Sequence, residues 1–471
     1  MINFGTGGWR EIIGDGFTRA NVRLITQALC DRMASEGVGG RGLVVGHDRR
    51  FLSLEAAHWV VEVLLGNDVP VTLVGRPAPT PMFMWTVRNL DCAYGIAVTE
   101  SHNPALYNGI KIFTEGGRDA EVAVTDDIAA RANALGDADV RAIEPEELPR
   151  HPLLTVQMSL NWYLDAIIDK LDMETIRHRH LHIVLEQMFG VAQTSLQTVL
   201  MTARCQVDVI NDRHDALFGG RMPSPTAATL EPLKQAVLER KADLGIATDG
   251  DADRLGIIDD TGQFLHPNQI LVLLYEYLLT TKGWRGPAVR NMSTTHLLDR
   301  VAQAHGEVCH EVPVGFKWIS AKMDETDAVI GGESSGGLTV RGHIAGKDGV
   351  YAGSLLVEMV AASGKKLSEL YADILATYGR LEMVEAAYTF AGERKAELQR
   401  RVFADHDLPD FGYDVARVGW DDGCKVYFAN DGWVTIRFSG TEPVLRVFCE
   451  MPTLAEAEQV GALVASHLGL G

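Results

Sequence analysis

The chain has 471 residues, too many for a single hydrophobic core, so three or four domains of ordinary size are expected. It carries 43 Lys and Arg against 63 Asp and Glu, and the net charge of −20 argues against nucleic acid as its main partner, since a basic surface is expected there. The opening "MINFGTGGWR" lacks the regions of a secretory signal, the most apolar stretch (270–279) is too short to span a membrane, and the six cysteines form no CxxC pair. These features predict a cytoplasmic protein with reduced thiols and no membrane partner.

The first 150 residues alternate short apolar strands with amphipathic helices. "GLVVGHD" (42–48) predicts a strand, and a helix follows over 53–67. "VTLVGRPAPTPM" and "CAYGIAVTESHNP" each predict a further strand that ends in a polar loop. This alternation is typical of βαβ units and a mostly parallel sheet.

The loop "VTESHNPALYNGIK" (98–111) places Ser101 between an acid and His102, with Lys111 ten residues further on. His102 could serve as a base and Lys111 as a cation beside a reacting oxygen. A Ser-His dipeptide does not make a hydrolase triad, whose members face one another across a fold, and the chain has no GxSxG elbow. The residues alone leave two interpretations open, a structural turn serine and a reactive one.

The strand and helix rhythm recurs between residues 151 and 365, as in "LHIVLEQMFG" and "ADLGIATDGDADRLGIIDDTG". The stretch 270–279 predicts a buried helix. After about residue 365 three strands lie close together before a final helix, which is typical of an α+β domain. The expected domains are α/β over 1–150, 151–248 and 249–365, and α+β over 366–471.

The turn "TDGDADR" (248–254) places Asp249, Asp251 and Asp253 at a spacing of two directly after an apolar strand. Three carboxylates so close together repel one another unless a cation gathers them, so Mg²⁺ is the expected partner. An EF-hand loop needs Gly at its sixth place and Glu at its twelfth, where this chain has Arg254 and Asp260. A solvated acidic turn is the alternative.

Three glycine-containing turns are ambiguous singly. "RFSGTEP" (437–443) combines Arg437 with Ser439, Gly440 and Thr441, a set that suits a phosphate dianion. The alternative is that the same residues form a tight hairpin turn with a surface arginine. "GGESSGG" (331–337) offers one carboxylate for sugar hydroxyls or is a flexible turn. "GTGGWR" (5–10) is a glycine-rich loop that ends in Arg10.

Together and in this order, the five stretches resemble the α-D-phosphohexomutase superfamily, the phosphoglucomutase/phosphomannomutase enzymes, over nearly the whole chain. The resemblance implies a heart-shaped fold of four domains. Three are similar α/β domains with mixed sheets, and the fourth is an α+β domain like the TATA-box-binding protein. It also implies a central cleft that takes one loop from each domain, and a cytoplasmic monomer or homodimer that acts on a phosphosugar.

The resemblance also implies roles for individual residues. Ser101 matches the phosphorylated serine, which shares Mg²⁺ with Asp249, Asp251 and Asp253. Lys111 matches the general acid/base, Arg10 the arginine beside the phosphoserine, and His102 is a neighbour in the catalytic set. The expected substrate-binding residues are Arg50 of "GHDRR", Arg254, Lys317 of "VGFKWI", Glu333, Ser335, Arg437, Ser439, Gly440 and Thr441.

The implied reaction interconverts a sugar 1-phosphate and a sugar 6-phosphate, most often of glucose or mannose, through a bisphosphorylated sugar that also serves as activator. Lys111 is the favoured proton carrier, because burial among cations would lower the pKa of a lysine. The alternatives are phosphoglucosamine mutase, phosphopentomutase, a metal-dependent phosphatase and a non-catalytic sugar-phosphate sensor. Relatives more often have Ala at Glu100, and mannose- and glucosamine-accepting relatives often have His at Gly337, whereas "RGHIAGKDG" (341–349) resembles the glucomutase-like branch.

Overall fold

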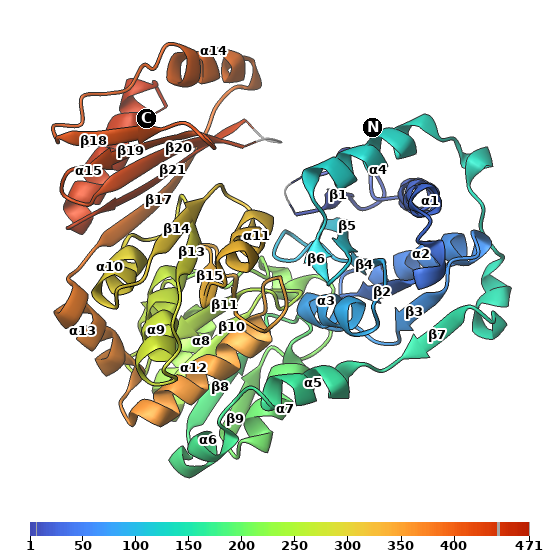
Figure 1. The fold of residues 1–471 in the computed structure, drawn as a ribbon, viewed down its shortest axis with the longest axis horizontal. Coiled ribbons are helices and arrows are strands. Elements are labelled where there is room, and N and C mark those ends of the chain that lie inside the picture. Colours follow the sequence, from blue (N-terminus) through green and yellow to red (C-terminus); the bar gives the residue numbers. More distant parts are fainter. Residues whose placement is uncertain (6, 440–442, 471) are drawn as a thin grey trace. The chain divides into compact units, whose positions relative to one another are not determined.

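The computed structural model describes residues 1–5, 7–439 and 443–470. The chain divides into two compact units, unit 1 with Met1–Ile270 and Ser335–Leu370, and unit 2 with Leu271–Ser334 and Tyr371–Gly471 (Figure 1). Among the described residues, no helix combines the length and the apolar character that crossing a membrane requires.

The first sheet of unit 1 is mixed. Its strands follow the order β1 (Trp9–Ile12), β5 (Tyr107–Thr114), β4 (Tyr94–Val98), β2 (Leu43–His47), β3 (Val71–Val74) and β7 (Leu154–Gln157), and β6 (Arg118–Asp119) pairs with β5. The neighbours from β4 to β7 are parallel, whereas β1, β5 and β6 are joined by antiparallel pairs. Because β4 and β5 are antiparallel neighbours, residues 99–106 form a loop at the carboxyl end of β4. These residues are called the serine loop below.

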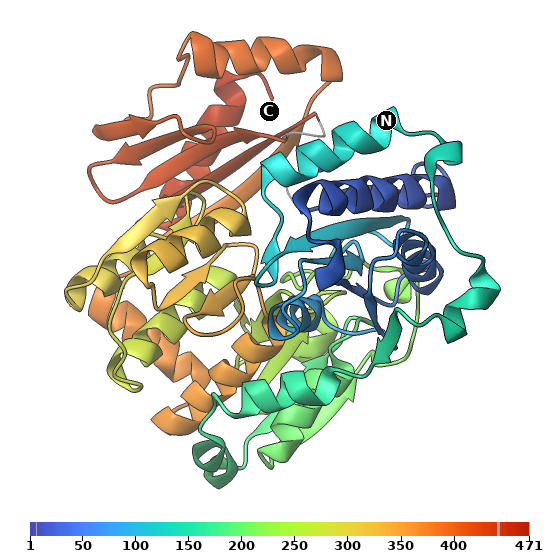
Figure 2. The ribbon, with the colours of Figure 1, turned by 45° about the vertical axis from the view of Figure 1, so that its right-hand side comes forward.

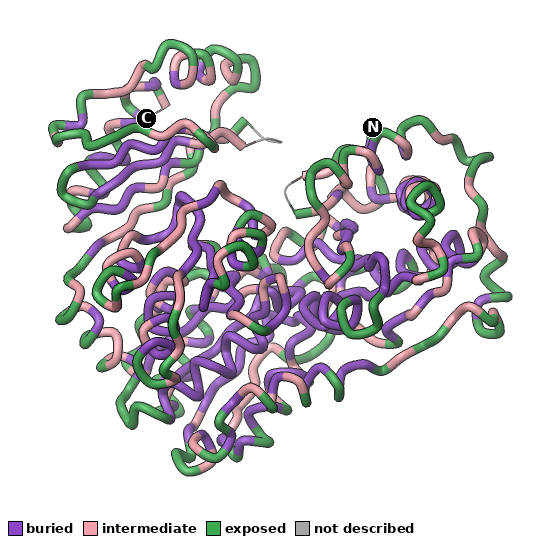
Figure 3. Tube along the Cα trace, in the orientation of Figure 1, coloured by how far each residue is buried: buried purple, intermediate pink, exposed green. Residues whose placement is uncertain are grey.

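Helices cover both faces of this sheet. α1 (Arg19–Glu36) and α2 (Ser53–Gly66) share one apolar core with inward side chains of β2 and β4, and α4 (Val122–Ala134) packs beside α1. α3 (Thr80–Asn89) lies on the other face, close enough that a Cβ at Gly46 of β2 would come within 2.2 Å of Phe83. The central strands are therefore buried on both sides (Figure 3), which explains why they appear in the sequence as continuous apolar runs.

The second sheet of unit 1 has the order β12 (Phe264–Leu265), β11 (Leu255–Ile258), β10 (Leu244–Thr248), β8 (His182–Glu186) and β9 (Gln206–Ile210). β8 is parallel to β9 and β10, but β10 and β11 are antiparallel, with Thr248 opposite Leu255. Residues 249–254 therefore form the tip of a hairpin within one sheet. The expected domain limit between 248 and 249 falls inside this hairpin, so the acidic turn belongs to the second sheet, while the other expected limits stay predictions. The helices of this part are α5 (Leu160–Ile168), α6 (Met173–Arg179), α7 (Gln193–Thr202), α8 (Glu231–Arg240) and α12 (Gly349–Ser363), and β16 (Leu338–Val340) precedes α12.

In unit 2, β13 (Ala288–Asn291) pairs in parallel with both β14 (Cys309–Val312) and β15 (Ile330–Gly332). The accompanying helices are α10 (Leu297–Ala304) and α11 (Phe316–Thr326), with the larger parts of α9 (Pro267–Thr280) and α13 (Leu367–Tyr378), whose first turns belong to unit 1. α9 contains the apolar stretch 270–279, whose residues other than Glu276 are buried. The prediction of a buried helix there is confirmed.

The C-terminal sheet of unit 2 is antiparallel throughout. Its order is β17 (Glu382–Thr389), β21 (Val444–Met451), β20 (Trp433–Phe438), β19 (Cys424–Phe428) and β18 (Val415–Gly419). α15 (Leu454–His467) packs on it through one apolar core, and the short α14 (Lys395–Gln399) adds Leu398 to that core (Figure 2). The predicted α+β domain is confirmed.

A buried ionic cluster joins this sheet to the parallel strands of the same unit. The Lys425 ammonium on β19 donates to the carbonyl of Met292 at 2.6 Å and to Glu311 Oε2 on β14 at 2.7 Å. Glu311 also accepts from Arg290 on β13, which is paired with Asp299. Burial, followed by the positive charge of Arg290, lowers the pKa of Lys425 to about 7.

Candidate active site

Ser101 lies in the serine loop, three residues beyond the end of β4. It is 5% exposed, and its backbone φ of 47° falls in the left-handed region, which costs a residue with a side chain about 1–2 kcal/mol. Its Oγ donates to Asp249 Oδ2 at 2.7 Å, and His102 Nδ1 lies 3.3 Å from the same oxygen. A buried, strained serine bonded to a carboxylate favours the reactive interpretation over an ordinary turn.

Arg50 holds the serine loop in this conformation. Its side chain is fully buried, and Nη1 and Nη2 donate at 2.6–3.2 Å to five backbone carbonyls, those of Glu100, Ser101, Asn103, Pro104 and Tyr107. Such a side chain has no surface to offer to a sugar phosphate. Arg50 was expected among the substrate-binding residues, but the structure places it beneath the loop as a support.

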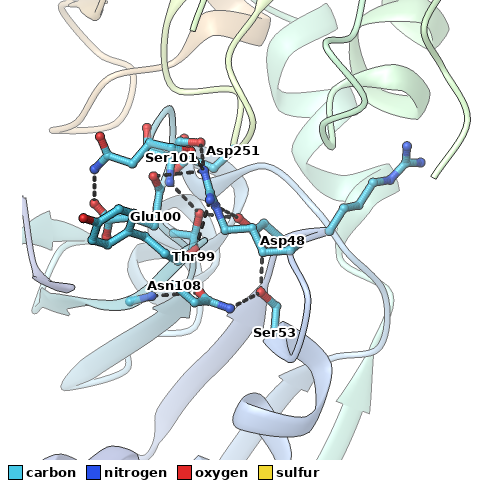
Figure 4. A network of polar contacts seen from close by, with 12 residues as sticks. Asp48, Ser53, Thr99, Glu100, Ser101, Asn108 and Asp251 are labelled. Atoms are coloured by element: carbon cyan, nitrogen blue, oxygen red, sulfur yellow. Dashed lines mark hydrogen bonds and ion pairs between the residues drawn. The ribbon is translucent and has the colours of Figure 1, made fainter. Parts of the chain in front are cut away.

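Asp48 connects this support to Ser101 (Figure 4). Its carboxylate accepts from the Arg50 backbone N–H at 2.8 Å, from Ser53 Oγ at 2.6 Å and from Thr99 Oγ1 at 2.7 Å. Thr99 Oγ1 in turn accepts from the backbone N–H of Ser101 at 3.0 Å. The end of β2 and the start of the serine loop are thus fixed to each other by buried hydrogen bonds.

The acidic triplet, Asp249, Asp251 and Asp253, occupies the hairpin tip between β10 and β11. All three residues are buried, and one ligand oxygen from each lies within 4.8 Å of the others. Within the described residues, this is the single group of three or more His, Cys, Asp or Glu side chains that converges in this way. The predicted acidic cluster is therefore formed in the structure.

The donor set fits a hard divalent cation. Asp251 Oδ1 and Asp253 Oδ1 are buried without a hydrogen-bond partner, which is costly unless another group binds them. Burial, followed by the charges of Asp253 and Asp251, raises the pKa of Asp249 well above its ordinary value. A Mg²⁺ ion bound to these oxygens would remove both penalties, since it prefers carboxylate oxygen ligands.

Gly250 allows the acidic triplet and the serine loop to approach each other. A Cβ at this position would lie 2.5 Å from the carbonyl oxygen of Ser101 and 3.4 Å from the ring of Pro223. The close approach brings Ser101 Oγ within hydrogen-bonding distance of Asp249 and therefore depends on the missing side chain.

Two lysines lie against the acidic triplet. Lys111 Nζ on β5 is 2.7 Å from Asp251 Oδ2 and 3.1 Å from Asp253 Oδ2, and Lys347 Nζ is 2.9 Å from Asp253 Oδ2. Burial lowers the pKa of Lys111, but the carboxylates of Asp251 and Asp253 outweigh it and raise that pKa above its ordinary value. The expected lowering is wrong for this arrangement, because carboxylates rather than cations surround the ammonium.

His102 and Arg254 flank the same group. Burial, followed by the positive charge of Arg254, lowers the pKa of His102 well below its ordinary value, so its imidazole is neutral at pH 7. The Arg254 backbone N–H donates to Asp249 Oδ1 at 3.1 Å, and its Nε lies 3.8 Å from Asp253 Oδ1. His102 therefore lies beside Ser101 and Arg254 beside the acidic triplet, while the catalytic role expected for His102 and the substrate-binding role expected for Arg254 stay predictions.

Arg10 on β1 faces Glu100, the residue beside Ser101 at which this chain departs from the family pattern. Arg10 Nε lies 3.3 Å from Glu100 Oε1, and Asn103 Nδ2 donates to the same oxygen at 2.5 Å. Burial raises the pKa of Glu100, while Arg10 acts in the opposite direction. The extra carboxylate next to the serine is thus balanced by the arginine expected there.

The expected sugar- and phosphate-binding residues lie mostly in unit 2. Glu333 is buried after β15, where Asn291 Nδ2 lies 3.5 Å from its Oε1, and Lys317 is in the first turn of α11. Arg437 on β20 donates to Asp422, and the Ser439 carbonyl accepts from Lys395. Ser335 is exposed and belongs to unit 1, while Gly440 and Thr441 lie outside the described residues.

Comparison with known proteins identifies the chain. Its residues 1–139, 161–262 and 266–378 match the phosphoglucomutase/phosphomannomutase alpha/beta/alpha domains I, II and III, and residues 393–467 match the C-terminal domain of that family. The chain belongs to the phosphoglucomutase/phosphomannomutase family. The match to domain II contains the whole β10–β11 hairpin, in agreement with the sheet.

Individual relatives of this family cover nearly the whole chain. A phosphoglucomutase/phosphomannomutase of Thermococcus kodakarensis is 30% identical over 97% of this chain and 96% of its own length. A Methanocella arvoryzae protein named a probable phosphoglucosamine mutase is 29% identical over 98% of this chain and 96% of its own. The crystal structure of a Thermus thermophilus chain, named as a phosphomannomutase, superposes with a TM-score of 0.85 at 30% identity and covers 100% of this chain and 99% of that one.

The second departure from the family pattern, Gly337, has a structural explanation. A Cβ at Gly337 would lie 2.1 Å from Lys347 Cδ, so the Lys347 stem fills the space that a side chain at 337 would need. In this member of the phosphohexomutase family, glycine at 337 therefore leaves room for the side chain of Lys347, whose ammonium contacts Asp253.

Sequence reasoning did not single out Lys347, Asp48 or Gly250. Lys347 lies in "RGHIAGKDG", 94 positions from Asp253, and nothing in their spacing predicts the contact. Asp48 had a signal, because "GHDRR" matches a family motif, but the prediction concerned its arginine. Gly250 also had a signal in the sequence, because small residues alternate with the aspartates in "TDGDADR".

Proposed function

We propose that the chain is a phosphohexomutase that interconverts a hexose 1-phosphate and a hexose 6-phosphate, with glucose and mannose as the first candidates, through a phosphoserine at Ser101. The observation that carries the proposal is the 2.7 Å hydrogen bond from Ser101 Oγ to Asp249, inside the buried acidic triplet. A turn serine without chemistry needs neither this carboxylate nor the two lysines beside it.

The acidic triplet would hold the metal. When bound, Mg²⁺ would draw charge from the phosphoryl oxygens and so make the serine oxygen a better leaving group. Arg10 and Lys111 add positive charge around Ser101, and such fixed charges supply most of the catalysis in phosphoryl transfer. A sugar 1,6-bisphosphate would activate the enzyme by phosphorylating Ser101.

In the first half-reaction the bond between phosphorus and Ser101 Oγ breaks, and the same phosphorus forms a bond to the free hydroxyl oxygen of the substrate, O6 for a 1-phosphate. His102, whose pKa is lowered by burial, accepts the hydroxyl proton and passes it to the departing Ser101 Oγ, which lies 3.3 Å from its Nδ1. The bisphosphorylated sugar then turns around. In the second half-reaction the bond between phosphorus and O1 breaks, and the same phosphorus bonds to Ser101 Oγ. His102 takes the serine proton. Lys111 donates a proton to the departing O1 and is reprotonated with the proton held by His102.

The sugar and its second phosphate need their own ligands. We assign the sugar hydroxyls to Glu333 and Ser335, with support from Lys317 and Arg254. We assign the phosphate that is not being transferred to Arg437 and Ser439, together with Gly440 and Thr441. These assignments rest on the family motifs and on the side-chain chemistry, because arginine and hydroxyl donors suit a phosphate dianion.

A second candidate substrate is glucosamine phosphate, because the Methanocella arvoryzae relative carries that name at nearly the same identity as the Thermococcus kodakarensis relative. A panel of glucose, mannose, glucosamine and ribose 1-phosphates, assayed with and without the matching bisphosphate, separates these substrates. The expected result is isomer formation with a hexose.

The same assay tests the reaction class. Ser101→Ala should abolish isomerisation, and intact-protein mass should show a phosphoryl group on the wild type alone. Release of free phosphate without isomer would instead indicate a phosphatase. Binding without turnover or phosphorylation would indicate a sensor.

A further inference from the structure

The turn between β18 and β19 contains an aspartate that bonds to two functional segments of unit 2. Asp422 Oδ1 accepts from Arg437 Nη2 at 2.9 Å, and Asp422 Oδ2 accepts from the backbone N–H of Val314 at 2.8 Å. The side chains of Asp422 and Arg437 are about three-quarters buried, at 26% and 23% exposure. One carboxylate thus joins the proposed phosphate-binding arginine to the segment that precedes α11.

The backbone of the turn between β18 and β19 allows the contact between Asp422 and Arg437. Cys424 on β19 pairs with Ile436 on β20, which brings Gly423 next to Arg437. A Cβ at Gly423 would lie 2.7 Å from Arg437 Cγ, and its φ of 96° is one that residues with side chains rarely adopt. Glycine at this position lets the turn lie directly on the stem of the arginine.

The other end of the link lies close to Lys317. Val314 is two residues before Phe316, where α11 begins, and Gly315 between them has a φ of 130°. The bond to Asp422 fixes the amide just before this turn and so the direction in which the first turn of α11 presents Lys317. A change at Asp422 therefore reaches the sugar-binding segment as well as the arginine.

We propose that Asp422 is a positioning residue that orients Arg437 for the substrate phosphate and holds the Val314–Lys317 segment in register with it. This proposal rests on the function proposed above. A guanidinium carries five N–H donors, so it can bind a phosphate while one Nη2–H remains on Asp422. Asp422 orients the arginine and reduces the side-chain freedom that binding would otherwise remove.

The test compares Asp422→Asn, Asp422→Ala and Arg437→Ala with a matched control, Asp421→Asn. Asp421 is the exposed neighbour in the same turn and undergoes the same change of charge. We expect Asp422→Ala to raise the KM for glucose 1-phosphate roughly 3- to 10-fold, with kcat changed less than about twofold. Asp422→Asn, which keeps an acceptor oxygen, should lie between Asp422→Ala and the wild type.

A double-mutant cycle separates positioning from general damage. If Asp422 acts through Arg437, adding Asp422→Ala to Arg437→Ala should raise KM by less than about half of its effect in the wild type, on a logarithmic scale. Fully additive effects, or an equal effect of Asp421→Asn, would overturn the proposal.

Two further measurements do not depend on turnover. Calorimetric titration with glucose 6-phosphate should show the same loss of affinity in Asp422→Ala, and hydrogen exchange should be faster in the peptide that contains Val314. A wild type without isomerase activity would refute the proposed function and leave both measurements intact. Unchanged exchange at Val314 together with unchanged affinity would refute the role of Asp422 alone.

Discussion

Replacing Gly250 with alanine tests whether the close approach of the acidic triplet and the serine loop is essential. The new Cβ would lie 2.5 Å from the Ser101 carbonyl oxygen, whereas ordinary contacts begin near 3.4 Å, so the two loops must separate by about 0.9 Å. The 2.7 Å bond between Ser101 Oγ and Asp249 would then lengthen to about 3.6 Å, which is no longer a hydrogen bond. A displacement of about 1 Å in a catalytic group lowers rates by about 100-fold, so we expect that loss in kcat.

The assay follows conversion of glucose 1-phosphate to glucose 6-phosphate with saturating Mg²⁺ and glucose 1,6-bisphosphate. Overpacking should also lower the free energy of unfolding by about 1–3 kcal/mol, which urea denaturation measures. Gly40→Ala is the matched control, because a Cβ at Gly40 meets nothing within 4 Å. A Gly250→Ala enzyme with more than about one third of wild-type kcat would refute the geometric reasoning.

Three further predictions concern the metal, the support of the loop and pH. Asp251→Asn should raise the Mg²⁺ concentration for half-maximal activity by at least about tenfold, measured by MgCl₂ titration after chelation, and full activity in chelator would contradict the metal role. Arg50→Lys should lower the free energy of unfolding by roughly 2–4 kcal/mol in urea titrations, since one ammonium cannot replace a guanidinium that donates to five carbonyls. Arg49→Lys is the control, and an equal loss of stability in that variant would argue against the role of Arg50 in supporting the serine loop. The pKa of Lys425 is lowered to about 7 by burial and then by Arg290, so above pH 7 the folded chain binds fewer protons than the unfolded chain. The free energy of unfolding of the wild type, relative to Lys425→Met, should therefore rise from pH 7 to 8.5 by up to about 1.4 kcal/mol per pH unit, and a flat difference in urea titrations would contradict the buried charge.

Much of the fold followed from short-range patterns. Apolar runs bounded by polar turns predicted the buried strands, and the alternation of Asp249, Asp251 and Asp253 predicted a converging acidic cluster, because a tight turn after a strand brings such side chains together. The domain limit expected at residue 248 was placed wrongly, although the sequence just after the acidic turn indicates a second strand. The apolar run "LGII" on the far side of the acidic turn is the second strand of a hairpin, so both strands belong to one sheet.

The remaining errors arose from contacts between distant parts of the chain. The motif around Arg50 predicted proximity to the site, but burial under five carbonyls depends on how the serine loop folds back over β2. The pKa of Lys111 depends on which charges surround it, and these come from a hairpin 140 positions away. The sequence around Lys347 does not predict its contact with Asp253, because a lone lysine in a polar stretch is usually solvated.

The hydrogen bonds that join Arg50 to the serine loop have a consequence for repeated turnover. Its guanidinium donates to the carbonyls of Ser101 and Asn103, and Asp48 Oδ2, 3.4 Å from its Nε, keeps it in place. In the proposed reaction, Ser101 Oγ gains or gives up a phosphoryl group while the peptide dipoles around it are already fixed in direction, so little reorientation is needed. The rigid loop can therefore serve the loaded and the unloaded enzyme alike, without a rearrangement in each cycle.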